Sequence, residues 1–148
     1  MNLHFSDWHN RIDPINPSRF FHRHQFVSQN RQRKEDLMGT ITYTDFEQVE
    51  IRVGQVVQAE EFPKARKPAY KLWIDFGELG IKKSSAQITD FYTPDTLVGR
   101  QVLAVTNFPP RQVADFMSEV LVLGVVLEDG AVALIQPDRS VPLGLRVL

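Results

Sequence analysis

A loop in the second half of the sequence, Asn107-Phe108-Pro109-Pro110-Arg111, carries side chains that could bind a ligand. The loop offers an amide, an aromatic ring and a guanidinium close together in the chain. Its two successive prolines fix their own φ angles and lack an N–H, so they end the apolar run Val102–Val105 and stiffen the loop around them. Binding groups are commonly carried on loops that a rigid scaffold positions. This proline loop, residues 107–111, is therefore a candidate binding element.

Small hydrogen-bonding side chains precede the proline loop in Ile81–Thr89, and an aromatic ring and a hydroxyl group come after it. Together these groups could line a groove that holds extended backbone and one apolar side chain, while Arg111 contacts a carbonyl or an acid. The candidate peptide-binding residues are Ser84, Ser85, Gln87, Asn107, Phe108, Pro110, Arg111, Phe116 and Ser118.

Basic side chains form a second candidate surface. Three of them lie in the polar, proline-bracketed loop Glu60–Pro68, which also contains Glu60 and Glu61. The loop is open to two interpretations, a solvated surface loop with both signs of charge or a loop that faces phosphates. Together with two lysines of Ile81–Thr89, the candidate RNA-binding residues are Lys64, Arg66, Lys67, Lys82 and Lys83.

Catalytic or metal chemistry has little support in the sequence. All four histidines, His4, His9, His22 and His24, lie in the first 37 residues, and the chain has no cysteine. There is no Gly-rich phosphate loop and no Ser/His/Asp set. The pair His22-x-His24 lacks the cysteine or well-spaced carboxylate that would complete a metal site. We therefore predict a binding protein rather than an enzyme, with no cofactor and no metal.

Length and charge exclude further classes. With 148 residues and a net charge of −1, the chain has no global attraction to nucleic acid or to an anionic membrane. No apolar run approaches the ~20 residues that span a bilayer, and the start lacks the basic and apolar regions of a secretory signal. We expect a cytoplasmic protein without membrane insertion.

Residues 1–37 differ from the rest of the chain. They carry six basic and four acidic side chains, sustain no apolar period, and are broken at Asp13-Pro14 and Asn16-Pro17. Met38 would make a natural start for the periodic part of the chain, so the segment is either an alternative upstream start or an appended arm. We predict an N-terminal extension at 1–37, possessing no fixed structure, and one domain at 38–148.

The elements that must position the candidate groups are those of a small β-barrel. Alternation is clearest in Ala69–Phe76, where every second side chain is apolar, and Thr93-Pro94 predicts the start of a short helix that Gly99 ends. Asp129-Gly130 is a strong hairpin signal. The expected strands are Val49–Ala59, Ala69–Phe76, Ile81–Thr89, Val102–Val105 and Glu119–Glu128, with Ala131–Ile135 completing the hairpin.

Other expectations concern single positions. Thr44 should cap a short helix or turn, Gly54 should mark a bulge or barrel corner, and Trp73 should pack rather than bind a base. The alternating segment Val141–Val147 should leave the barrel and pair with another chain. The fold class predicted is all-β, a five-stranded OB-fold barrel with a short helix between strands three and four and terminal extensions.

Several short motifs make a resemblance specific. They are Asp45-Phe46, Ile51–Val56, Ala59–Arg66, Asp75–Gly77, Ser84–Thr89, Gly99–Val102, Asn107–Arg111 and Ser118–Gly124. In these motifs, from about Ile41 to Leu148, the sequence resembles the tRNA-binding-domain family and, within it, the branch of CsaA-type secretion chaperones.

The resemblance implies a homodimer that binds unfolded or precursor polypeptides during protein export, independently of ATP. It also implies that the terminal segments build the dimer interface, for which the candidates are Ile41, Tyr43, Val141, Leu143, Leu145 and Val147. Elsewhere in the family the same barrel binds tRNA. This chain has Met117 where many relatives have lysine, so we expect a polypeptide ligand, with structured RNA as the alternative.

Overall fold

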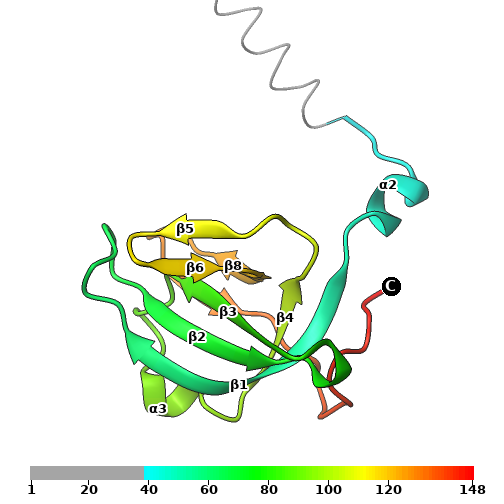
Figure 1. Ribbon diagram of the computed structural model, residues 1–148. Coiled ribbons are helices and arrows are strands. Elements are labelled where there is room, and N and C mark those ends of the chain that lie inside the picture. The colour runs from blue at the N-terminus through cyan, green and yellow to red at the C-terminus, as the bar shows by residue number, and fades with distance from the viewer. Residues whose placement is uncertain (1–38) are drawn as a thin grey trace, which may run out of the picture. The chain divides into compact units, whose positions relative to one another are not determined.

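A five-stranded antiparallel sheet is the centre of the computed structural model, which describes residues 39–148 (Figure 1). The sheet has the strand order β3-β2-β1-β4-β7 and curls into a nearly closed barrel within the compact unit Thr42–Leu148. Its strands are β1 (Ile51–Glu61), β2 (Tyr70–Asp75), β3 (Ile81–Ala86), β4 (Gln101–Val105) and β7 (Leu121–Val122). This arrangement confirms a mostly β, five-stranded barrel of OB type. The predicted extension, residues 1–37, lies outside the described residues and its boundary stays a prediction.

The predicted alternation of β2 is confirmed. Leu72 and Ile74 of this strand and Phe76 beyond it are fully buried. They form the main core with Val56 of β1 and with Leu97 of helix α3, Pro94–Leu97. Because side chains of a strand alternate between faces, the intervening Trp73 lies on the outer face of the barrel, where other side chains partly cover it.

β1 is long enough to pair on both sides. Its first half pairs with β4 and its second half with β2, and the register shifts between Val56 and Gln58. The bulge predicted at Gly54 is therefore wrong, because the extra residue is Val57, three positions farther along. Gly54 itself pairs with Val102, and a Cβ there would lie 2.5 Å from Ile74 Cγ2, so the glycine lets the core pack against the backbone.

The helices are short. The predicted helix start at Thr93 is confirmed, because its side chain caps α3 (Pro94–Leu97) and Pro94 takes the first helical position. The N-cap predicted at Thr44 is wrong. Helix α2 (Tyr43–Glu47) begins earlier, with Thr42 accepting a hydrogen bond from the Asp45 amide and the Asp45 carboxylate accepting one from the Thr42 amide. A 3₁₀ turn, η1 (Gly77–Leu79), joins β2 to β3.

Two small hairpins complete the barrel unit. β5 (Arg111–Val113) pairs with β6 (Phe116–Ser118), in a stretch where the sequence shows no clear period. The long strand expected at Glu119–Glu128 is wrong, because that segment divides into β7 and β8 (Gly124–Val126). The predicted Asp129-Gly130 hairpin is confirmed, since β8 pairs with β9 (Val132–Leu134) across a turn in which Gly130 has a φ of 88°.

The C-terminal segment does not leave the barrel as expected. It runs antiparallel along the first half of β1, where the Val53 amide donates to the Leu145 carbonyl and the Gly144 amide donates to the Val53 carbonyl. Only Arg146 forms a bridge in the strict sense, opposite Arg52, so Val141–Val147 is not a regular strand. The segment therefore shields an otherwise unpaired stretch of backbone within the same chain.

Candidate binding groove

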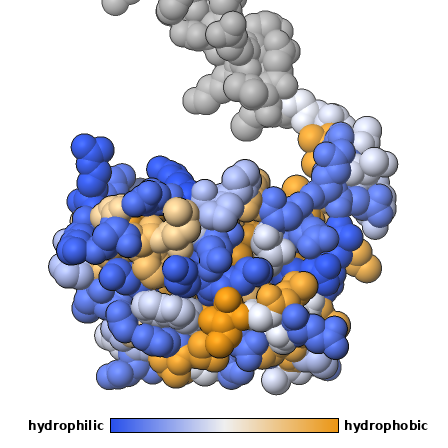
Figure 2. All heavy atoms as spheres, in the orientation of Figure 1, coloured by the Kyte–Doolittle hydropathy of each residue, from blue (hydrophilic) through white to orange (hydrophobic). Residues whose placement is uncertain are grey.

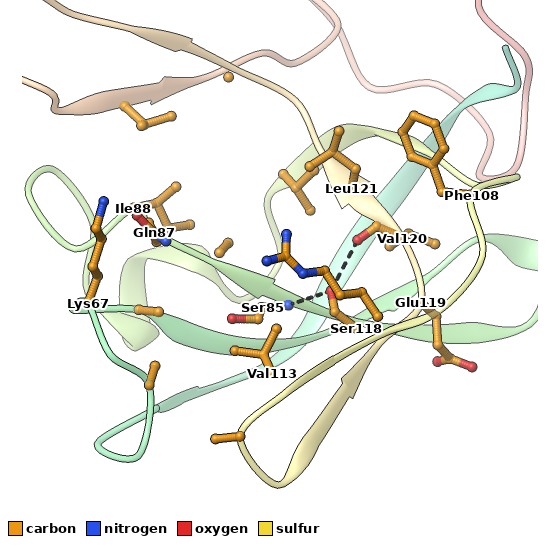
Figure 3. Close-up of a pocket in the computed structure, with 18 of the residues that line it drawn as sticks. Lys67, Ser85, Gln87, Ile88, Phe108, Val113, Ser118, Glu119, Val120 and Leu121 are labelled. Carbon is orange, nitrogen blue, oxygen red and sulfur yellow. Dashed lines mark hydrogen bonds between the residues drawn. The ribbon is translucent and has the colours of Figure 1, made fainter.

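A groove of about 1210 Å³ opens beside β3, an edge strand of the sheet (Figure 3). Five parts of the chain meet around it: the 62–69 loop, the end of β3, the proline loop, the β5–β6 hairpin and the segment 118–126. Four of these parts carry candidate residues that the sequence singled out: the 62–69 loop, the end of β3, the proline loop and the end of the β5–β6 hairpin at Ser118. The β-barrel thus brings residues that are far apart in sequence to one surface.

The base of the groove is the line along which the barrel closes. The Ser85 amide of β3 donates to Ser118 Oγ at 3.1 Å, and Ser118 Oγ donates in turn to the Val120 carbonyl at 3.4 Å (Figure 3). On the same edge, the Lys83 amide donates to Glu119 Oε2 at 2.8 Å and the Glu119 amide donates back to the Lys83 carbonyl. Side-chain acceptors on residues 118 and 119 and two main-chain bonds to the Lys83 carbonyl therefore join β3 to residues 118–120 in place of a regular ladder.

Apolar side chains form much of the groove's walls. Phe108 of the proline loop is 52% exposed, and Leu121 of β7 and Val126 of β8 are also exposed. Ile88, beyond β3, is buried and lies at the opposite side of the view from Phe108 (Figure 3), and Val113 of β5 also lines the groove. A concave, mainly apolar surface with a few polar groups is the usual form of a ligand site.

Basic side chains surround these walls. Lys64, Arg66, Lys67 and Arg111 all line the groove, and all four are exposed. Lys64 Nζ lies 2.5 Å from Asp115 Oδ2 of the hairpin turn, and this hydrogen bond lowers the pKa of the Asp115 carboxyl. Within residues 39–148, the other three cations form no ion pair with a carboxylate.

Five of the nine predicted peptide-binding residues line the groove, namely Ser85, Gln87, Phe108, Arg111 and Ser118. The other four have different positions. Ser84 is 1% exposed and its hydroxyl donates to the Val120 carbonyl at 3.0 Å, inside the barrel. The Asn107 side chain bonds to the backbone instead: it accepts from the Glu50 amide at 3.0 Å and donates to the Gln48 carbonyl at 2.7 Å. Pro109, not Pro110, borders the groove.

Phe116 is the fourth residue outside the groove, and it forms a small second core. It is 7% exposed and packs edge-on against Phe62 and Trp73, at ring-centre distances of 5.7 and 5.6 Å. Lys71 and Lys83 lie over its ring. Figure 2 shows a moderately apolar area among hydrophilic side chains near this hairpin. Phe116 fastens the β5–β6 hairpin to the outer face of the barrel, and the prediction that Trp73 packs is confirmed.

The predicted RNA-binding residues divide into two places. Lys64, Arg66 and Lys67 lie at the groove, whereas Lys82 and Lys83 lie half-buried on β3 outside it. Sequence reasoning missed Lys71, whose ammonium lies 4.9 Å from the centre of the Phe62 ring. It also missed the apolar lining residues Val113, Leu121 and Val126. Their apolar runs indicated strands, but not the side of the strand that faces a groove.

Among the described residues there is no cluster of three or more histidine, cysteine, aspartate or glutamate side chains that could hold a metal. The pair His22-x-His24 lies outside them. No helix in residues 39–148 is long and apolar enough to cross a membrane.

Comparison with known proteins defines the class to which this fold and groove belong. Residues 51–146 match the family described as "Putative tRNA binding domain", and the chain belongs to this tRNA-binding domain family. It is 37% identical over 112 residues to the methionine–tRNA ligase of Bdellovibrio bacteriovorus, matching 76% of this chain. It spans only 16% of that relative's length.

Two solved structures are similar over their whole length. The chaperone CsaA of Bacillus anthracis is 53% identical with a TM-score of 0.72, and the CsaA chaperone protein of Picrophilus torridus is 50% identical with a TM-score of 0.69. Each comparison covers 74% of this chain and 100% of the other. The resemblance to the chaperone branch of the family is thereby confirmed.

Proposed function

We propose that this protein is a non-enzymatic, ATP-independent chaperone that binds unfolded or precursor polypeptides in the groove beside β3. One observation carries the proposal: a mainly apolar groove of about 1210 Å³ lies on a barrel that is 53% identical to a CsaA chaperone over that chaperone's full length. A cytoplasmic location and a role in protein export follow from the same resemblance and are part of the proposal.

An extended polypeptide suits this groove for physical reasons. Phe108 and Leu121 offer exposed apolar surface to a side chain, and Gln87 offers an amide group to the backbone of the ligand. The proline loop holds Phe108 stiffly, because Asn107 ties its start to Gln48 and Glu50. A pre-positioned ring loses little conformational entropy when it binds.

Replacing Phe108 by alanine tests the groove directly. The half-exposed ring could lose about 100 Å² of accessible surface to a ligand, worth at most about 2.5 kcal/mol. We expect Phe108→Ala to weaken binding of a fluorescently labelled unfolded precursor about 5- to 60-fold, depending on how much of the ring the ligand covers. The matched control is Phe91→Ala, which removes a ring of similar exposure, 54%, outside the groove. Equal affinities of the two variants would place the ligand elsewhere.

We also propose a homodimer, which would offer two grooves to one long chain and gain avidity. Leu145 is 51% exposed on the C-terminal segment, Leu148 more so, and Tyr43 of α2 is exposed as well, so apolar surface remains there to be covered. Val141, Leu143 and Val147 are half-buried within the chain, while Ile41 is exposed. Leu145→Asp should give monomers by sedimentation velocity. Val98→Asp, at a site of equal exposure after α3, controls for the added charge, and an undisturbed Leu145→Asp dimer would remove this interface.

Structured RNA is the second candidate ligand, because basic side chains are combined with aromatic rings. Lys71 and Lys83 flank Phe116 beside the basic loop 64–67, and the strands of this face are those by which OB barrels commonly bind nucleic acids.

Salt separates the two ligands. We expect the labelled precursor to keep its affinity within about threefold between about 50 and 200 mM salt, whereas RNA held through several phosphates would lose orders of magnitude. Titrating labelled tRNA and labelled precursor under both conditions tests this. Tight, steeply salt-dependent tRNA binding together with absent precursor binding would replace the chaperone proposal by the RNA alternative.

A further inference from the structure

We infer that the groove selects apolar polypeptide segments that are flanked by acidic residues. This inference deepens the proposed function and rests on it. It concerns the charge of the groove's surroundings, which neither the family nor the similarity to chaperones specifies.

The charges that line the groove are strongly unequal. Four basic side chains, Lys64, Arg66, Lys67 and Arg111, line it, against Glu119 as the acidic one. The chain as a whole has a net charge of −1, so this basic rim is a local feature and not a reflection of composition. Opposite charges near a binding surface favour one partner and exclude its charge-reversed counterpart.

Glu119 does little to neutralise the rim. Its Oε2 accepts a hydrogen bond from the Lys83 amide at 2.8 Å, which holds the carboxylate against the edge of β3. Figure 3 shows this side chain pointing away from the central groove residues Ser85 and Ser118, whereas Lys67 stands at the groove's margin. The Glu119 carboxylate therefore helps to close the barrel, and the basic side chains of the rim remain available to a ligand.

The cations also occupy more than one side. Arg66 and Lys67 belong to the loop between β1 and β2, while Arg111 ends the proline loop that carries Phe108. Lys64 is paired with Asp115 of the hairpin turn, which leaves three cations without such a partner in residues 39–148. In Figure 3, Phe108 and Lys67 lie at opposite ends of the groove, so a segment whose apolar residue contacts Phe108 and that extends along the groove would pass basic groups from both loops. This placement favours acidic residues next to the apolar core.

The expected selectivity is moderate because the cations lie at the solvent-accessible rim. An exposed ion pair changes an equilibrium by about 1.5- to 5-fold, so two or three such contacts give about a tenfold preference. The preference should shrink at high salt, since exposed charges are screened.

Three labelled peptides with one shared apolar core and acidic, neutral or basic flanks provide the test. Their dissociation constants, measured by fluorescence anisotropy with the full chain at about 50 and about 300 mM salt, should rise from acidic to neutral to basic flanks. At the lower salt concentration we expect about tenfold between the acidic and basic peptides, and less at the higher one.

Charge reversal assigns the preference to the rim. Lys67→Glu should weaken the acidic peptide about three- to tenfold and strengthen the basic one. Arg139→Glu makes the same change of charge at an exposed site outside the groove and should leave the ratio within about twofold. Arg139 has Asp138 as its partner, so native-like melting of both variants is checked first.

The outcomes distinguish a failure of the proposed charge selectivity from a failure of the proposed chaperone function. If the neutral peptide binds but the flanks make no difference, or basic flanks bind more tightly, the selectivity is wrong and the chaperone proposal stands. If no peptide binds, both fail. If Lys67→Glu abolishes tRNA binding and leaves all peptides unchanged, the rim serves phosphates and the inference is overturned.

Discussion

Replacing Phe116 by alanine should destabilise the protein strongly without removing a groove contact. The ring is 7% exposed and packs edge-on against Phe62 and Trp73. Truncating a buried phenylalanine to alanine costs about 3–5 kcal/mol, and each edge-on aromatic pair accounts for about 0.5–1.5 kcal/mol of such a loss. This second core is small and lies at the outer face of the barrel, where solvent can refill the space. We therefore expect the lower end, about 3 kcal/mol, which is more than about a hundredfold in the unfolding equilibrium.

Denaturant unfolding measures this change. The midpoint for Phe116→Ala should fall while the denaturant slope stays unchanged, as for a loss of stability in a two-state domain. Met117→Ala is the matched control, because Met117 is the next residue of β6 and is 40% exposed on the opposite face. We expect the control to change stability by no more than about 0.5 kcal/mol.

A second substitution at position 116 shows whether the ring holds the hairpin in place or contacts the ligand. Because Phe116 faces the barrel, Phe116→Leu should keep peptide affinity within about threefold under conditions where it is folded. A large affinity loss with native stability would show that the ring contacts the ligand, as the sequence alone suggested. Wild-type stability of Phe116→Ala would refute the packing argument itself.

Two further substitutions probe the scaffold of the groove. Gly54→Ala should cost about 1–3 kcal/mol, because the new methyl would lie 2.5 Å from Ile74 Cγ2 in a filled core; an unchanged melting temperature would contradict this close packing. Asn107→Ala removes both hydrogen bonds to the backbone of Gln48 and Glu50 and should cost about 1–2 kcal/mol in denaturant unfolding. Faster amide exchange at Glu50 is also expected, and native protection there would count against the anchoring role of Asn107.

Patterns confined to a few neighbouring residues predicted the structure well. The alternation of β2, the start of α3 at Thr93 and the hairpin at Gly130 each follow from local steric and hydrogen-bond rules. The β5–β6 hairpin was missed because its turn lacks the usual glycine or asparagine. Ala114 takes the positive φ, 50°, that those residues normally supply. The cap of α2 was misplaced because Thr42 and Thr44 are both acceptable capping residues and only the backbone decides between them.

The candidate site was predicted in part, and one error was avoidable. Side chains of a strand alternate, so Ser84 and Ser85 of β3 cannot both face the groove. Ser84 faces inward, is buried and does not line the groove, whereas Ser85 and Gln87 border it; Ala86, at the end of the strand, is buried and also lines the groove. Phe116 was a different case, since only the tertiary position of β6 over Trp73 shows which way its ring points.

The closure of the barrel limits how a ligand can bind. An edge strand such as β3 would normally offer its free amides to an added strand. Here the outward amides of Lys83 and Ser85 already donate to the side chains of Glu119 and Ser118. A polypeptide cannot extend the sheet along this part of β3 without breaking both bonds. The groove therefore favours binding through side chains around Phe108 and beyond the end of β3 at Gln87, which makes the apolar walls and basic rim the source of its selectivity.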